Sequence, residues 1–412
     1  IRVVSEIVPC ECTVKGKIET GVSAMMDDII AALTLPLIAE EESPQSKRTE
    51  ELPRIAFKGN MEEVNRFYYR RGWTDGLPII PPTEEAVREM LTGTDLPPDH
   101  VVAMIIPRLG KATVEKIAVN AVMAGALPTY MPLLIAAVQT VMNLRTNFTT
   151  YEVSTGSWSP FWIINGPVRN DLNINSGTGA LSPGNIANAA IGRAIGLIIK
   201  NIGGARAGIE DMGVLGNPGK YSMVVAENEE DSPWEPLHVE QGFNKEESTI
   251  TVFFPNCSAQ IWPYGTDDKG ILRAAIRNVI PGRKGLLGFM MSPIHARTMA
   301  EYGWSKRGIA EFISEFARVP ASHHSEYYGV SLVNYLRDKE RVPLDPDDSL
   351  PIIRDPGWVR IIVAGGPGNV IGLFSGGWNQ GGDWVTRKAE LPAKWDGLVE
   401  KYKDLVPSHI HY

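Results

Sequence analysis

The chain has few cysteines and no excess of basic residues, and both absences narrow what it can be. Its 412 residues include only Cys10, Cys12 and Cys257. This set is too sparse for a disulfide framework and is typical of a reducing, cytoplasmic location. The formal net charge is -8 at pH 7, whereas nucleic acids and anionic membranes select basic surfaces. We therefore expect neither nucleic acid nor a membrane as a partner.

Signatures of several common enzyme classes are also missing. The chain contains no Walker A loop, no G-x-G-x-x-G that opens a helix, and no G-x-S-x-G, H-E-x-x-H or kinase signature. Its first residues lack the basic segment and apolar run of a secretory signal. Residues 117–144 carry no charge, but Pro128 and Pro132 lie at their centre. This stretch predicts two short buried helices that meet at a proline turn rather than a membrane span.

The patterns that are present predict an α/β fold. Strand-like and helix-like segments alternate along the chain, which favours a mixed sheet with helices packed on it. The 40 glycines and 30 prolines predict tight loops at the strand ends. No internal repeat with a fixed period is visible. The strands are expected at residues 101–106, 161–165, 221–226, 248–254, 286–291 and 359–364, and the main helices at residues 183–202, 269–279, 292–302 and 305–319.

Composition divides the chain into three parts. Residues 1–52 form an N-terminal segment with an acidic linker, because the run Glu-Glu-Glu-Ser-Pro-Gln-Ser-Lys-Arg that begins at Glu40 cannot bury much surface. Residues 53–386 form the main α/β domain, and residues 387–412 form a peripheral C-terminal helix and tail. Cys10 and Cys12 are candidates for a redox or soft-metal pair, although such a site needs a further ligand.

The densest candidate site is the acidic segment 227–240, which directly follows a predicted strand. Glu235 and His238 are candidate catalytic residues, because clustered carboxylates raise one another's pKa and suit acid–base chemistry. Glu227, Glu229 and His238 are candidate ligands of a divalent metal, the one cofactor that the residues suggest. The alternative is a solvated acidic loop.

A second candidate site is rich in amides and small residues, which let backbone N–H groups converge on an anion. Arg169 or Arg193 is a candidate to clamp a carboxylate or phosphate. The glycine-rich turn after the strand at residues 359–364 has the same potential, and His295 follows another strand as a catalytic candidate. The alternative is a set of tight turns with a capping or core histidine. The expected substrate-binding residues are Asn165, Arg169, Asn173, Asn175, Asn185, Gly366 and Gly368.

Several stretches read as motifs: Gly72-Trp73-Thr74-Asp75-Gly76-Leu77-Pro78, Pro81-Pro82-Thr83-Glu84-Glu85, Ala112-Thr113-Val114-Glu115-Lys116-Ile117-Ala118, Ile174-Asn175-Ser176-Gly177-Thr178-Gly179 and Ser232-Pro233-Trp234-Glu235-Pro236-Leu237-His238-Val239-Glu240. On these stretches the chain resembles a bacterial group associated with UGSC-motif (seleno)proteins. The helix at residues 22–33 resembles the final helix of a UGSC domain, which implies a larger fusion or a processed product. The Cys/Sec-Gly-Ser-Cys motif itself is absent. The resemblance therefore implies redox or carbon–heteroatom chemistry with a thiol or selenol supplied by a partner domain or subunit.

Together these patterns predict an enzyme, or the large subunit of one, that acts on a small polar or anionic substrate. An oxidoreductase or a lyase fits best, and a homo-oligomer is expected. One alternative is a metal-dependent hydrolase or lyase that uses the 227–240 cluster. Another is a non-catalytic structural subunit of an assembly, in which the apolar segment 117–144 and the glycines serve packing.

Overall fold

A computed structural model describes residues 15–42, 54–263, 265, 267–280, 285–323, 347–376 and 382–405. The chain forms two compact units, Ile1–Lys58 and Gly59–Tyr412. The sequence placed this boundary after residue 52. The first unit contains the helices α1 (Lys15–Thr34) and α2 (Ala39–Glu42). The candidate pair Cys10 and Cys12 lies outside the described residues.

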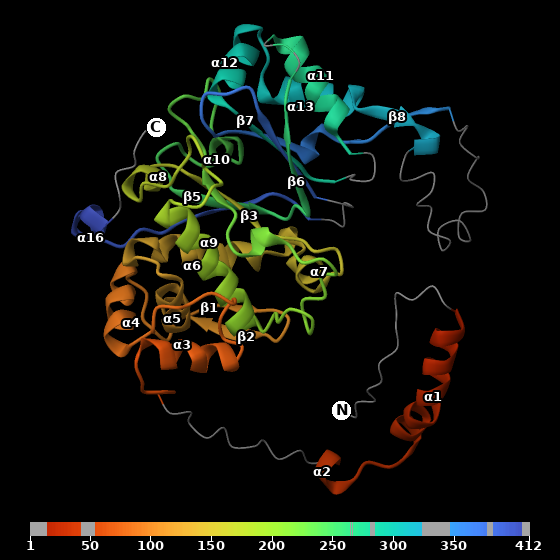
Figure 1. The fold of residues 1–412 in the computed structure, drawn as a ribbon, viewed down its shortest axis with the longest axis vertical. Helices are drawn as coiled ribbons and strands as arrows, with labels where there is room; N and C mark the ends of the chain where they lie inside the picture. The colour runs from red at the N-terminus through yellow and green to blue at the C-terminus, as the bar shows by residue number, and fades with distance from the viewer. Residues whose placement is uncertain are drawn as a thin grey trace. The chain divides into compact units, whose positions relative to one another are not determined.

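The second unit is an α/β fold, as predicted, and it contains two four-stranded mixed sheets (Figure 1). Its strands are β1 (Val101–Ile105), β2 (Gly110–Thr113), β3 (Phe161–Asn165), β4 (Val224–Ala226), β5 (Thr249–Phe253), β6 (Cys257–Ile261), β7 (Leu287–Met291), β8 (Arg318–Pro320), β9 (Ser349–Pro351), β10 (Val359–Val363), β11 (Ile371–Ser375) and β12 (Val385–Lys388). Its helices are α3 (Met61–Arg70), α4 (Glu84–Met90), α5 (Val114–Ala124), α6 (Met131–Val141), α7 (Phe148–Val153), α8 (Val168–Asp171), α9 (Ile186–Ile198), α10 (Leu237–Glu240), α11 (Asp268–Asn278), α12 (Pro293–Glu301), α13 (Lys306–Phe316) and α16 (Trp395–Tyr402).

The two large sheets repeat one arrangement, which the sequence did not reveal. Their strand orders are β12-β5-β3-β4 and β6-β11-β7-β10. In each sheet an inner strand, β3 or β7, pairs in parallel with an edge strand and antiparallel with its other neighbour. The strands β3, β4 and β5 therefore occupy the same positions in the first sheet as β7, β10 and β11 occupy in the second. The next strand of each series lies in the opposite sheet: β6 is an edge strand of the second sheet and β12 is an edge strand of the first.

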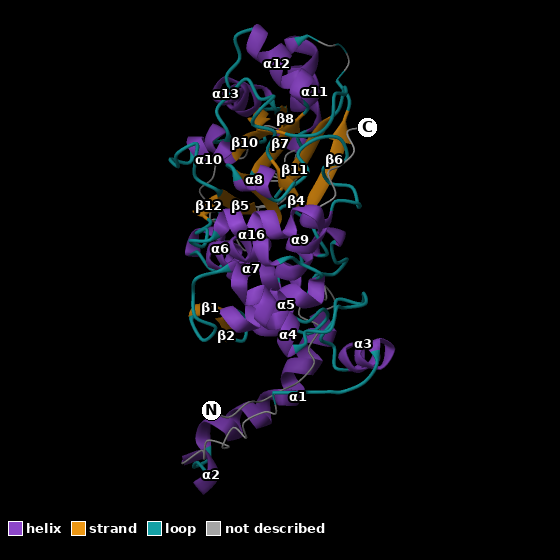
Figure 2. Ribbon diagram, turned by 90° about the vertical axis from the view of Figure 1, so that its left-hand side faces the viewer, coloured by secondary structure: helices purple, strands orange, loops and turns teal. Residues whose placement is uncertain are grey.

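The sheets stack face to face between two layers of helices (Figure 2). Alternation along β3 shows how the sequence achieves this. Phe161 and Ile163 face the second sheet, and the Phe161 ring stacks on Phe374 of β11 with 4.3 Å between ring centroids. Trp162 and Ile164 face the other way, into the core that contains α5, α6 and α9. Because both faces of the strand are buried, its sequence is a continuous apolar run.

The uncharged segment 117–144 folds as the sequence predicted. Its residues form α5 and α6, which pack in the core and are joined through the turn at Pro128. The helix cap predicted at Thr83 is also confirmed, since its hydroxyl accepts a hydrogen bond from the Ala86 amide at 3.2 Å. Among the described helices, none combines the length and the apolar character needed to cross a bilayer.

The C-terminal part is integrated into the second unit rather than appended to it. Strand β12 pairs antiparallel with β5 across the boundary that the sequence placed after residue 386. In α16, Trp395 and Tyr402 are buried, and the Trp395 indole N–H donates to Asp171 at 2.7 Å. The aromatic side chains of this helix therefore contribute to the core.

Candidate functional site

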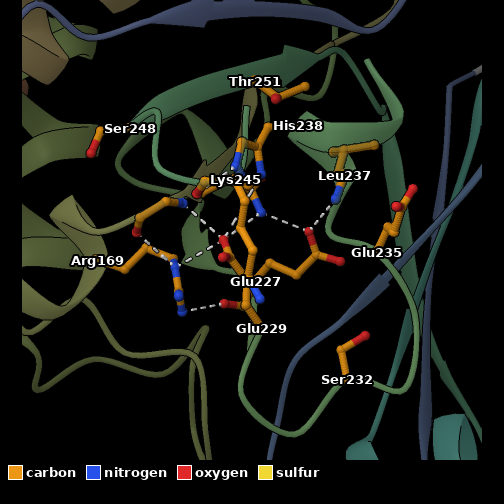
Figure 3. A network of polar contacts seen from close by, with 12 residues as sticks. Arg169, Glu227, Glu229, Ser232, Glu235, Leu237, His238, Lys245, Ser248 and Thr251 are labelled. Atoms are coloured by element: carbon orange, nitrogen blue, oxygen red, sulfur yellow. Dashed lines mark hydrogen bonds and ion pairs between the residues drawn. The ribbon is translucent and has the colours of Figure 1, made fainter. Parts of the chain in front are cut away.

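The predicted acidic segment follows β4, whose carboxyl end lies beside that of the parallel strand β3, and its first residue, Glu227, belongs to a network of polar contacts (Figure 3). The Glu227 side chain is fully buried. Its carboxylate accepts hydrogen bonds from the Asn165 amide and the Leu237 backbone N–H, each at 2.7 Å. The Lys306 ammonium of α13 lies 3.2 Å from the other carboxylate oxygen. Both oxygens of this buried charge are therefore satisfied by the protein.

Glu229 and Arg169 extend the network. The Glu229 carboxylate lies 3.0 Å from the Arg169 guanidinium and accepts the Gly166 backbone N–H at 2.8 Å. Arg169 also forms a pair of hydrogen bonds with Glu230, at 3.0 and 3.1 Å. This bidentate contact lowers the pKa of Glu230 to about 2. Arg169 is thus held by neighbouring carboxylates of its own chain, which leaves it little capacity for an anionic ligand.

The predicted catalytic pair, Glu235 and His238, is not brought together. His238 is fully buried, and its Nε2 atom lies 3.3 Å from the Lys245 carbonyl oxygen. Its Nδ1 atom lies 4.0 Å from Glu229. Glu235 is exposed, and Figure 3 shows its side chain directed away from the Glu227 and Glu229 carboxylates. The two residues therefore occupy different environments.

The amides of the second candidate site organise their own loop. Asn185 caps α9 by accepting the Asn188 N–H at 3.0 Å, and it donates to the Asn173 carbonyl at 2.9 Å. Asn175 accepts the Gly177 N–H at 2.9 Å and donates to the Thr178 carbonyl at 3.1 Å. These hydrogen bonds give Asn185 and Asn175 a structural role in the described fold.

The glycine turn and His295 meet this loop from the second sheet. The Gly365 N–H donates to the Ser176 carbonyl at 2.8 Å. A Cβ atom on Gly366 would lie 2.1 Å from the Thr178 hydroxyl, so this position requires glycine. His295 is 2% exposed, and its Nε2 atom lies 2.8 Å from the Asn369 side-chain oxygen. Burial lowers the pKa of His295, so the ring is neutral at pH 7.

Gly368 completes the contact between the glycine turn and α12. Its carbonyl oxygen accepts the Ser292 hydroxyl at 2.8 Å, and Ser292 also caps α12. Three of the predicted segments, 165–188, 227–240 and 365–369, thus converge with His295 where the two sheets meet. They converge as a packed junction.

The junction shows no ready-made metal site. Within the described part of the chain, no three His, Cys, Asp or Glu side chains are grouped to hold a metal ion. A cavity of about 410 Å³ borders the junction through Glu240 and Lys306. Burial raises the pKa of Glu240. Lys306 contacts both Glu227 and Glu240, so ion-paired side chains lie between the cavity and the buried network.

A second cavity, of about 350 Å³, lies between the Gly72–Pro78 motif, α7 and α9, and we call it the Glu152 cavity. Much of its wall is apolar and includes the rings of Tyr151, Trp158 and Phe254. Tyr151 contacts both other rings, with centroid distances of 4.7 and 5.2 Å. An apolar hollow with a few polar groups is the usual form of a small-molecule site.

Glu152 is the polar group that distinguishes this cavity. It sits near the end of α7 and is 9% exposed. Its carboxyl forms no hydrogen bond with any described residue. Burial raises its pKa to about 8, opposed by the charge of Lys220 and assisted by that of Asp211, which form an ion pair with each other. The carboxyl is therefore neutral at pH 7.

The opposite wall is built from the Gly72–Pro78 motif and α9. Arg193 forms a bidentate ion pair with Asp75, at 2.8 and 3.0 Å. Lys200 donates to the carbonyl oxygens of Gly72 and Thr74, the latter at 2.6 Å. Lys200 lies in a π-helical turn, Ile199–Gly203, that follows α9. Such turns are frequent at functional sites because they redirect a side chain.

Sequence reasoning missed Glu152 and Lys200. Glu152 is the one charged residue between Arg145 and Arg169. A lone carboxylate among apolar and small residues is a signal of burial, and it could have been noticed. The residues that share the cavity wall with it come from distant parts of the chain, so its place on that wall could not have been predicted.

The chain matches no model of a known protein family, no curated protein and no solved structure. The resemblance to the UGSC-associated group therefore stays a prediction. The function has to be argued from the geometry alone.

Proposed function

We propose that the protein is an enzyme that transfers a proton to or from a small ligand bound in the Glu152 cavity. The observation that supports this proposal most directly is the Glu152 carboxyl itself. It is 9% exposed, lines a cavity of about 350 Å³, and has no hydrogen-bond partner among the described residues. A buried polar group seldom lacks a hydrogen-bond partner, so a carboxyl without one among the described residues is expected to bond to a ligand or to water in the cavity.

The chemistry follows from the protonation state of this carboxyl. Below pH 8 it is a neutral acid that donates a hydrogen bond or a proton to a ligand atom. Above pH 8 it is a carboxylate that accepts a proton. A pKa close to the working pH is the property of a general acid or base, because both forms are then accessible.

The geometry favours Glu152 over the pair that the sequence predicted. His238 is fully buried and Glu235 is exposed to solvent, whereas Glu152 lines a cavity. A role for Glu235 and His238 stays a prediction, which alanine substitution of each residue tests. The thiol or selenol partner implied by the resemblance also stays a prediction, and no role given to Glu152 requires it.

The test is proton exchange on a panel of small organic acids, incubated with the full chain in deuterium oxide and followed by NMR. We expect deuterium incorporation or product formation with the natural chain for at least one acid. Glu152→Gln should lower that rate by at least a hundredfold, because general acid–base catalysis contributes about 10²–10⁴-fold.

Glu62→Gln is the matched control, because Glu62 is an exposed carboxylate on α3, away from the cavity. It should keep the natural rate. If Glu152→Gln keeps the natural rate on the responsive acid while remaining folded, Glu152 is not the proton-transfer group and the proposal fails.

A further inference from the structure

We propose that the ligand of the Glu152 cavity is a small organic monoanion with an apolar body, whose carboxylate binds the Lys200 ammonium. This inference rests on the proposed function, because it concerns the same cavity. It adds the charge and the shape of the ligand. Its support is the pairing of charges around the cavity wall.

Two of the three cations on the wall are already paired. Arg193 is neutralised by Asp75, and Lys220 by Asp211. Lys200 has no carboxylate within ion-pair distance among the described residues, and its two observed acceptors are backbone carbonyl oxygens. An ammonium group has three N–H donors. Lys200 therefore keeps one donor for a ligand, while Asp75, which is ion-paired with Arg193, acts on its charge from beyond ion-pair distance.

The remaining groups leave one positive charge uncompensated at neutral pH. Besides Glu152 and Lys200, the titratable residues that line the cavity are Asp75, Tyr151, Arg193, Asp211, Lys220 and Tyr221. The two ion pairs cancel, and burial keeps Tyr151 neutral by raising its pKa. Glu152 is also neutral below pH 8. A ligand with one negative charge neutralises the net positive charge of the cavity wall, and a ligand with two would leave a net negative charge.

Burial strengthens the preference. Burial lowers the pKa of Lys200 because it disfavours the charged form, and the charge of Asp75 opposes this shift only in part. A ligand carboxylate restores a favourable environment for that charge. The volume of about 350 Å³ is at the lower end of ligand sites, which span roughly 300–1,000 Å³. The rings of Trp158 and Phe254 provide contact for a compact apolar or aromatic body.

The experiment compares benzoate with its neutral counterpart benzamide, using calorimetric titration of the full chain at pH 7. We expect benzoate to bind at least tenfold more tightly. Equal affinities, or tighter binding of benzamide, overturn the proposal. This comparison requires no substitution, so it does not depend on the folding of a variant.

Two variants then locate the charge. Lys200→Gln should weaken benzoate at least tenfold and leave benzamide unchanged, which also reports that the cavity is intact. Lys111→Gln, at an exposed lysine of β2, removes the same charge elsewhere and should change neither affinity. If Lys111→Gln weakens benzoate as much as Lys200→Gln does, the preference comes from overall charge and the proposed contact is wrong.

The pH dependence separates this inference from the proposed function. Benzoate should bind the natural chain more weakly as the pH rises through 8, because the Glu152 carboxylate then repels it. Glu152→Gln should lose less affinity than the natural chain between pH 7 and pH 9, because it lacks that carboxylate while the titration of Lys200 is common to both proteins. If the natural chain shows no preference for benzoate but Glu152→Gln abolishes proton exchange, the ligand assignment alone is wrong. If the natural chain prefers benzoate but Glu152→Gln keeps the natural exchange rate, the catalytic role alone is wrong.

Discussion

Replacing Glu152 by glutamine should change how the stability of the protein depends on pH. The pKa of Glu152 rises from 4.5 to about 8 in the fold because burial disfavours the charged form. Between these two values the unfolded chain has lost the proton and the folded chain has kept it. The folded state then binds more protons than the unfolded state, so the free energy of unfolding falls as the pH rises.

The size of the effect follows from the two pKa values. Each pH unit between them costs about 1.4 kcal/mol of unfolding free energy. From pH 5 to pH 8 the natural chain should lose about 4 kcal/mol relative to Glu152→Gln. Well below pH 4.5 and well above pH 8 the difference in unfolding free energy between the two proteins should not change with pH. Glu152 then has the same protonation state in the folded and the unfolded chain. Glutamine has nearly the same shape and does not ionise.

The assay is urea unfolding of both proteins at several pH values from 4 to 9, followed by tryptophan fluorescence. Only the difference between the two proteins is interpreted, since it cancels the titration of every other group. A difference that stays flat from pH 5 to pH 8 would mean that Glu152 ionises as an exposed carboxyl does. That result would refute both the burial argument and the acid–base role built on it.

Two further predictions concern the junction. Lys306→Met should lower the free energy of unfolding by about 3–5 kcal/mol, because it leaves the fully buried Glu227 carboxylate without its counterion. Urea unfolding measures this loss, and a loss below about 1 kcal/mol would contradict the role given to the ion pair. Gly366→Ala should cost about 1–3 kcal/mol, because its Cβ atom would lie 2.1 Å from the Thr178 hydroxyl. Gly368→Ala is the matched control and should stay within about 0.5 kcal/mol, because no atom lies within 4 Å of its Cβ position. Equal thermal stabilities for the two alanine variants would show that the loops do not pack this closely.

Much of the fold was predictable because its signals are local. The apolar run of β3 predicts a strand buried on both faces, and the alternation of side-chain direction along any strand assigns its residues to the two faces. Thr83 caps its helix through a contact three residues away. The prolines at the centre of residues 117–144 separate α5 from α6. Each of these outcomes depends on neighbours along the chain.

The candidate site was predictable in its segments but not in their roles. Residues 165–188, 227–240 and 365–369 do meet, because each follows a strand and the strand ends of the two sheets adjoin. Whether their side chains face solvent or one another is a property of packing. Glu227 contacts Lys306, 79 positions along the chain, and no local pattern reveals that partner.

The sequence by itself determined the elements, their caps and the location of the polar loops, since short-range sterics and hydrophobic periodicity decide these. The tertiary structure alone decided the exchange of β6 and β12 between the sheets and the burial of the acidic segment. It also decided that Glu152 and Lys200 line one cavity. Burial sets the charge of a carboxyl through desolvation, and desolvation depends on every chain segment that packs around it. That is why Glu235 attracted attention in the sequence, whereas Glu152 emerged only from the fold.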